Sequence, residues 1–209
     1  MTKNDAGLQA LARLREGNRR FASNVRSVDS LLSQLRRSEL AQKQEPHAII
    51  LCCSDSRSPA EIVFDQGLGD LFVIRVAGNI VAPSQIGSIE FAADAFHTRL
   101  VVVMGHTGCG AIEAAIDASK AHVEASKNLL SIVDRVRPSV EQLLAADPSL
   151  ERKTLARAAV RANVKASAEQ LRQAPMLEGL VKNDALLVVG AVYDMASGEV
   201  DFFDGNPTL

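Results

Sequence analysis

Four short runs of this 209-residue chain are apolar at almost every position and rich in Val, Ile and Leu; the clearest is Leu100-Val-Val-Val-Met104. Unbroken apolar runs of this length are typical of strands buried on both faces, as in a parallel sheet with helices on either side. The other three runs are residues 48–53, 71–76 and 185–192. Helical stretches separate them, so the sequence predicts an α/β fold with a central, mostly parallel four-stranded sheet flanked by helices.

The helices between these runs are expected over residues 86–96 and 109–118, with three more between residues 122 and 180. That last segment is rich in Ala, Glu, Arg and Leu. We expect its helices to begin or end near its prolines, because proline interrupts a helix interior. These prolines are Pro138, Pro148 and Pro175.

The two ends of the chain add one element each to this core. Apolar residues recur at helical spacing from Leu8 to Phe21, and a second helix is expected over about residues 29–42, so residues 1–45 are interpreted as an N-terminal helical arm. Near the other end, Ala196-Ser197-Gly198 is typical of a hairpin turn, which predicts an antiparallel edge strand over residues 199–203. No linker interrupts the chain, and residues 1–209 are predicted to form one domain.

Composition narrows the class of protein further. The chain carries 23 Lys and Arg against 25 Asp and Glu, a formal net charge of −2, which argues against nucleic-acid binding. No apolar run approaches the roughly 18 residues of a membrane span, so no membrane partner is expected. The N-terminus lacks the features of a signal peptide, and three cysteines do not make an extracellular disulfide framework. We therefore expect a cytoplasmic protein.

Residue types that bind metals follow two of the predicted strands. Cys53 ends the first strand, and His106-Thr-Gly-Cys109 follows the strand at 100–104. Ligands bind parallel sheets at the carboxyl ends of their strands, so these residues meet if the two strands are neighbours. Zinc favours thiolate and imidazole ligands in tetrahedral sets. Three protein ligands leave a fourth position for water or for Asp55, as in catalytic rather than structural zinc sites.

The adjacent cysteines, Cys52 and Cys53, are expected to differ in role. Successive side chains of a strand point to opposite faces, so Cys52 is interpreted as a packed thiol rather than a ligand. A disulfide between adjacent residues would be strained and is not expected.

The two ligand-bearing segments together resemble the paired signature of the β-carbonic anhydrases: Cys53-Ser-Asp-Ser-Arg57 and His106-Thr-Gly-Cys109. The similarity extends over nearly the whole chain. It includes Gln44-Glu-Pro46, Phe72-Val-Ile-Arg-Val-Ala-Gly-Asn79 and Gly87-Ser-Ile-Glu-Phe91. The resemblance implies a zinc-dependent lyase that converts carbon dioxide reversibly to bicarbonate and a proton through a zinc-bound hydroxide.

Position by position, the resemblance implies one Zn²⁺ per subunit, held by Cys53, His106 and Cys109. It implies a gate in which Arg57 either holds Asp55 or releases it to close the fourth zinc position.

For the substrate pocket, the resemblance implies that Gln44 orients carbon dioxide, usually from the partner subunit; Gln66 is the alternative to Gln44. It also implies that Phe72 forms an apolar wall and that the Gly110 N–H donates to bicarbonate. The family uses an N-terminal helix to embrace a partner, so a homodimer or homotetramer is expected.

Two other functions are compatible with the sequence. A hydrolase of the same superfamily, acting on carbonyl sulfide or carbon disulfide, would use the same metal chemistry. A structural zinc module is the alternative from another class, although such sites usually show four Cys or His ligands in close pairs. Substitution of Asp55 would distinguish a structural from a catalytic zinc site, since only a catalytic site should lose turnover with zinc still bound.

Overall fold

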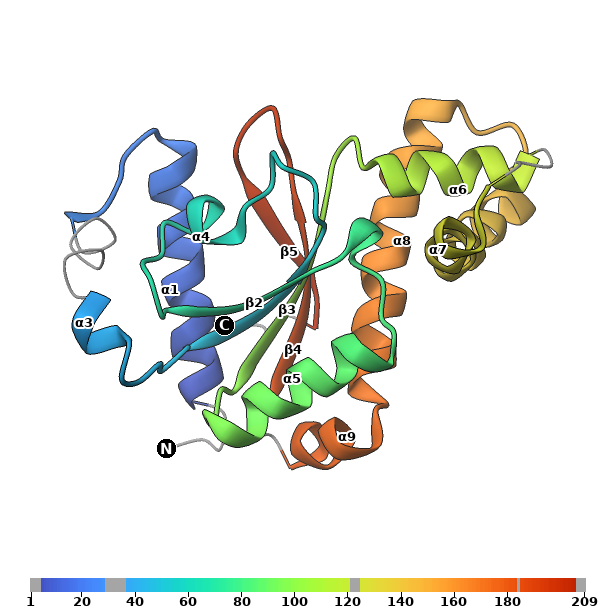
Figure 1. The fold of residues 1–209 in the computed structure, drawn as a ribbon. Coiled ribbons are helices and arrows are strands. Elements are labelled where there is room, and N and C mark those ends of the chain that lie inside the picture. Colours follow the sequence, from blue (N-terminus) through green and yellow to red (C-terminus); the bar gives the residue numbers. More distant parts are fainter. Residues whose placement is uncertain (1–4, 29–36, 121–124, 184, 206–209) are drawn as a thin grey trace.

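The sheet of this protein has five strands in the order β2-β1-β3-β4-β5. The computed structural model describes residues 5–28, 37–120, 125–183 and 185–205. β1, β2, β3 and β4 run parallel, and β5 pairs antiparallel with β4 (Figure 1). The predicted α/β class, the parallel core and the antiparallel C-terminal edge strand are therefore confirmed. The strands are β1 (Ala48–Cys52), β2 (Leu71–Arg75), β3 (Leu100–His106), β4 (Leu187–Tyr193) and β5 (Val200–Asp204).

Helices cover both faces of the sheet, as the apolar strands require. In chain order they are α1 (Asp5–Ala22), α3 (Arg37–Leu40), α4 (Ala60–Val63), the 3₁₀ helix η2 (Ala77–Asn79), α5 (Pro83–Ala95), α6 (Gly110–Lys120), α7 (Lys127–Ala146), α8 (Arg152–Arg172) and α9 (Pro175–Lys182). The sequence predicts a helix over residues 29–42, and α3 corresponds to part of it. Residues 29–36 lie outside the described part of the chain. Among the described helices, none combines the length and apolar character that a bilayer span requires.

Each face of the sheet has its own core. On one face, Leu11 and Leu14 of α1 pack with Ile50, Val102 and Val189. The opposite face is covered by α5, α8 and α9 (Figure 1). A third cluster joins α6, α7 and α8 beyond the carboxyl ends of the strands, and it includes Cys53 and Cys109. The metal-binding residue types thus lie where the sheet meets this helical layer.

The expectation that Pro138 marks a helix boundary is wrong: Pro138 lies inside α7. The helix continues because its apolar stripe does, with Val133, Val136 and Val140 all buried. Pro138 itself is exposed. Tertiary packing of this stripe therefore outweighs the hydrogen bond that proline removes. The other two prolines lie at boundaries as expected, Pro148 between α7 and α8 and Pro175 at the start of α9.

Candidate metal centre

The three metal-binding residues come together because β1 and β3 are parallel neighbours. Cys52 pairs with Met104, so Cys53 and His106 emerge at the same edge of the sheet. β3 is longer than expected and carries His106 as its last residue. A turn with Gly108 at φ 68°, a conformation that favours glycine, then leads to Cys109, directly before α6. Strand pairing and one glycine turn therefore assemble the trio.

The geometry of the trio fits a tetrahedral metal site. The ligand atoms of Cys53, His106 and Cys109 lie within 4.8 Å of one another, and all three residues are buried. The two sulfur atoms are 4.0 Å apart. Two zinc–sulfur bonds of about 2.3 Å at a tetrahedral angle would separate them by roughly 3.8 Å. The spacing between the sulfurs is therefore close to what a shared ion requires.

The imidazole of His106 is oriented for the same purpose. Its Nδ1 lies 3.0 Å from the carbonyl oxygen of Thr107, to which an Nδ1–H donates. Its Nε2 is buried and has no hydrogen-bond partner among the described residues. A buried nitrogen without a partner is unfavourable unless something else binds it, and metal-bound histidines commonly donate their second N–H to a carbonyl. His106 thus presents a lone pair toward the two sulfurs.

Electrostatics favour a thiolate at Cys53. Its sulfur shares a hydrogen bond with Cys109, and this bond, more than any other contact, lowers the pKa of the Cys53 thiol well below its usual value. The backbone N–H of Gly78 also donates to Cys53 Sγ, at 3.4 Å. The thiolate is the form that binds metals.

The neighbouring thiol of Cys52 lies on the opposite side of its strand, in the α1 core, as expected. Burial raises its pKa to about 12. All three cysteines are free, so no disulfide joins Cys52 to Cys53.

Beside the trio, Arg57 binds Asp55 through two parallel hydrogen bonds. Nε donates to Oδ1 at 3.0 Å and Nη2 to Oδ2 at 2.8 Å, and the Arg57 backbone N–H adds a third bond to Oδ1 at 2.9 Å. The side-chain bonds from Arg57 hold the pKa of Asp55 well below its usual range. Arg57 also donates to the Gly108 carbonyl, at 3.3 Å, which links the ion pair to the turn between His106 and Cys109. Asp55 is therefore an ionised carboxylate held two residues beyond Cys53.

The residues expected to contact substrate are divided between the two ends of the sheet. Gly110 is the first residue of α6, next to Cys109. Gln44 precedes β1, and Phe72 is the second residue of β2, so both lie toward the end of the sheet opposite Cys53. There Phe72 packs against Phe96, with ring centroids 6.0 Å apart. One chain alone does not bring Gln44 or Phe72 to the trio.

Gln66, the alternative to Gln44, is engaged elsewhere. It is buried, and its amide donates to the carbonyl oxygens of Phe64 and Asp65 while its Oε1 meets His47 Nε2 at 2.9 Å. Those bonds engage its polar atoms with the end of α4 and with the residue that precedes β1.

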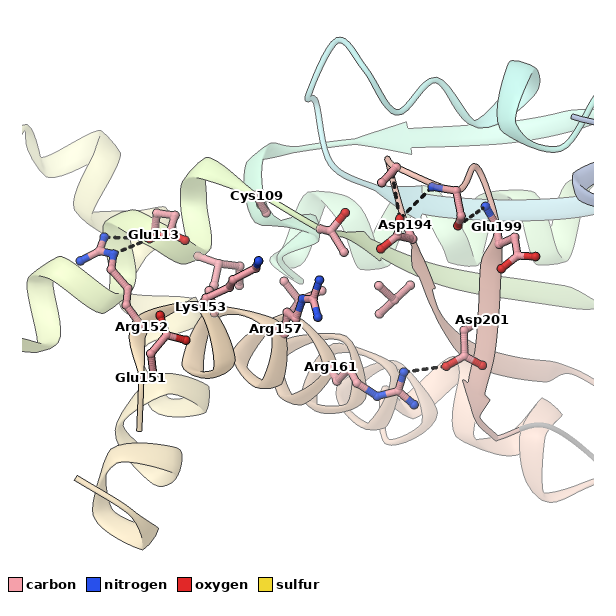
Figure 2. Close-up of a pocket in the computed structure, with 18 residues that line it drawn as sticks. Cys109, Glu113, Glu151, Arg152, Lys153, Arg157, Arg161, Asp194, Glu199 and Asp201 are labelled. Carbon is pink, nitrogen blue, oxygen red and sulfur yellow. Dashed lines mark hydrogen bonds and ion pairs between the residues drawn. The ribbon is translucent and has the colours of Figure 1, made fainter. Parts of the chain in front are cut away.

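A cavity of about 1140 Å³ borders the trio on the side of Cys109 (Figure 2). It lies between α8, which contributes Lys153, Arg157 and Arg161, and the turn from β4 to β5, which contributes Asp194. Charges of both signs line it, and several are paired within the chain; Arg161, for example, bonds Asp201 at 2.6 Å. Sequence reasoning missed this surface, because α8 packs beside the strand ends only in the folded chain.

The fold and this site define a class: an α/β protein in which two cysteine sulfurs and one imidazole, at the carboxyl ends of neighbouring strands, are close enough to hold one metal ion, beside an arginine-held aspartate. Comparison with known proteins agrees with this class. The family model described as carbonic anhydrase matches residues 48–200. The chain is 37% identical over 188 residues to a carbonic anhydrase of Mycolicibacterium smegmatis, covering 90% of this chain and 89% of the relative.

Solved structures give the same result. A β-carbonic anhydrase of Aspergillus fumigatus superposes with a TM-score of 0.74 at 28% identity, over 96% of this chain and 92% of that one. A tetrameric β-carbonic anhydrase of Sordaria macrospora gives 0.71 at 25% identity, over 79% and 84% of the two chains. This chain belongs to the β-carbonic anhydrase family. The predicted family and enzyme class are thereby confirmed.

Proposed function

We propose that this protein catalyses the zinc-dependent, reversible hydration of carbon dioxide to bicarbonate and a proton. The observation that carries the proposal is the buried trio of Cys53, His106 and Cys109, with ligand atoms within 4.8 Å of one another. The relatives named as carbonic anhydrases support the same reaction. A reducing compartment such as the cytoplasm suits this chemistry, because the ligand thiols must stay reduced.

In this proposal the trio holds one Zn²⁺ per subunit and leaves a fourth position open. When bound, the ion would supply a hydroxide nucleophile at neutral pH by lowering the pKa of a coordinated water from 15.7 to roughly 7. The Thr107 carbonyl binds Nδ1 of His106, so Nε2 would be the nitrogen that holds the ion. The N–H of Gly110, at the start of α6, is a donor for bicarbonate, since helix N-termini favour anions.

Asp55 and Arg57 are proposed to act as a gate. While Arg57 holds both carboxylate oxygens, the fourth position is left to solvent. If the pair separates, Asp55 is close enough in sequence to Cys53 to become the fourth ligand and exclude solvent. A carboxylate competes with hydroxide for the metal, so raising the pH favours the open form. Activity should climb from about pH 6 to about pH 9, and a flat profile would refute the gate.

The substrate pocket is proposed to be completed by a second copy of the chain, as a homodimer or homotetramer. Gln44 and Phe72 lie away from the trio of their own chain, so they would line the substrate pocket beside the partner's metal site. The helical arm of residues 1–45 would embrace that partner. The tetrameric relative from Sordaria macrospora supports an oligomer. Sedimentation analysis tests this, and a fully active monomer would contradict it.

The central experiment pairs metal analysis of the purified protein with stopped-flow hydration of carbon dioxide. Cys53→Ala should lose zinc and activity. Cys52→Ala is a matched control, because it removes the adjacent thiol from the opposite face, and it should keep both. Full activity in a metal-free wild-type protein, or equal zinc loss in the two variants, would overturn the proposal.

Two further assays separate the other functions. Besides closing the site, Asp55 would hydrogen-bond the hydroxide on a bound zinc ion. Asp55→Ala should therefore retain zinc but lose turnover, whereas a purely structural metal site would show no turnover to lose. Carbonyl sulfide and carbon disulfide should be hydrolysed more slowly than carbon dioxide is hydrated. The opposite order of rates would favour the sulfur-substrate hydrolase.

A further inference from the structure

Two side chains bind the backbone of Gly78, and one of them, Cys53, is a proposed metal ligand. The Gly78 N–H donates to Cys53 Sγ at 3.4 Å, and the Gly78 carbonyl accepts from Asn163 Nδ2 at 2.9 Å. Asn163 stands 85 residues further along the chain, in α8, and is only 2% exposed. The buried side-chain amide of Asn163 therefore connects α8 to the sulfur of Cys53 through one residue, Gly78.

Gly78 has little intrinsic preference for the backbone conformation that it adopts. It adopts φ 69° and ψ 15°, in the left-handed region, and an added Cβ would lie 3.0 Å from the Cβ of Ala111. Glycine is therefore the residue that fits here, and glycine has the greatest backbone freedom. The bond from Asn163 restrains this residue, with help from Ser167, whose hydroxyl donates to the Asn79 carbonyl at 3.4 Å.

The contacts of α8 with the sheet do not need an amide at this position. Val160 and Val164 already fill the space against β3, where a Cβ on Gly105 would lie 3.0 Å and 2.7 Å from their methyl groups. A buried amide is unfavourable unless it is hydrogen-bonded, so an apolar residue would serve packing equally well. The hydrogen bond to the Gly78 carbonyl therefore explains why residue 163 carries an amide.

Hydrogen bonding to the thiolate matters for the metal. An N–H aimed at a thiolate stabilises negative charge on sulfur, so the sulfur donates less charge to a bound ion. Two thiolates formally cancel the charge of Zn²⁺, which weakens its effect on coordinated solvent. A donor held against one of them offsets part of that loss.

We propose that Asn163 is a positioning residue for the metal centre, which acts by holding the Gly78 N–H against the Cys53 thiolate. This inference rests on the proposed function, since it assumes that Cys53 binds the metal. Asn163 does not touch the ion or the substrate.

The test uses the 209-residue chain loaded with Co²⁺, whose thiolate-to-metal charge-transfer band reports on the sulfur ligands. Asn163→Leu keeps the size of the side chain and removes the donor; Asn163→Ala is the second variant, should the first fail to fold. In both, the band should move to longer wavelength, because the thiolate electrons are less stabilised. Competition with a chelator should show Zn²⁺ binding weakened by about tenfold, because Cys53 loses the backbone contact that orients its sulfur, and this loss outweighs the greater charge donation.

Ala168→Gly is the matched control. It also destabilises α8, by about 1 kcal/mol through helix propensity, and it has no hydrogen bond to η2 among the described residues. It should leave the cobalt band and the zinc affinity at wild-type values. Folded Asn163 variants with wild-type band and affinity would overturn the inference alone. A wild-type protein that binds neither Co²⁺ nor Zn²⁺ would overturn the proposed function, and the inference with it.

Discussion

Gly17 in α1 gives the sharpest test of how the N-terminal helix packs against α4 and the β4–β5 hairpin. An added Cβ would lie 1.8 Å from the Phe64 carbonyl oxygen, and contacts under 3.0 Å essentially never occur. The obstacle is backbone, which cannot rotate away as a side chain can. In Gly17→Ala the helix must therefore retreat by about 1.2 Å, the difference between these two distances.

The magnitude follows from what that movement breaks. The adjacent Asn18 donates to the carbonyls of Val63 and Gly198, at 3.1 Å and 2.9 Å, and accepts from the Val200 N–H at 2.8 Å. A shift of this size takes such bonds beyond hydrogen-bonding distance, and each contributes about 1 kcal/mol. Alanine returns about 1 kcal/mol of helix propensity. The free energy of unfolding should fall by about 2 kcal/mol.

Urea unfolding followed by far-ultraviolet circular dichroism measures this change, at one protein and zinc concentration because association and metal binding shift apparent stability. Gly179→Ala in α9 is the matched control. It is also a helical glycine, but an added Cβ there meets nothing within 4 Å. It should stabilise the protein by about 0.5 to 1 kcal/mol. If both variants shift the midpoint in the same direction, the reasoning about backbone contact is refuted.

Three further predictions concern stability. Pro138→Ala should raise the free energy of unfolding by up to about 3 kcal/mol, because it restores a backbone donor inside α7; an unchanged urea midpoint would contradict this. Asp65→Ala should lower it by about 3 kcal/mol, because the fully buried carboxylate pairs with Arg20 at 2.6 Å and Arg26 at 3.0 Å; thermal unfolding measures the loss. Burial lowers the pKa of His47 below 6.5, so the unfolded chain binds its proton more readily. Stability should therefore rise with pH up to about 6.5, and less so in His47→Gln.

Much of the fold could be predicted from the sequence because its signals are local. The unbroken apolar runs specify strands buried on both faces, and the structure has strands at all four of them. Cys53, His106 and Cys109 could be singled out because their residue types and spacing follow strand ends. That these ends meet required β1 and β3 to be neighbours, which the pattern suggests but does not dictate.

Only the tertiary structure reveals contacts between segments far apart in the chain. Residues 65–70 look like an ordinary turn, yet Asp65 is the buried anchor of two arginines from the N-terminal segment. Pro138 has the local signal of a helix end, but burial of the stripe around it keeps α7 continuous.

The same division holds at the metal centre. The candidate ligands can be recognised in the sequence, because sulfur and imidazole are the side-chain groups that zinc prefers. Their surroundings are not: nothing in the local sequence connects Asn163 to Gly78, 85 residues away, or directs that glycine's N–H to Cys53. The sequence thus determines which atoms are available to bind a metal ion. Packing of α8 against the end of the sheet decides how those atoms are held, since a hydrogen bond depends on position and direction that only the folded backbone fixes.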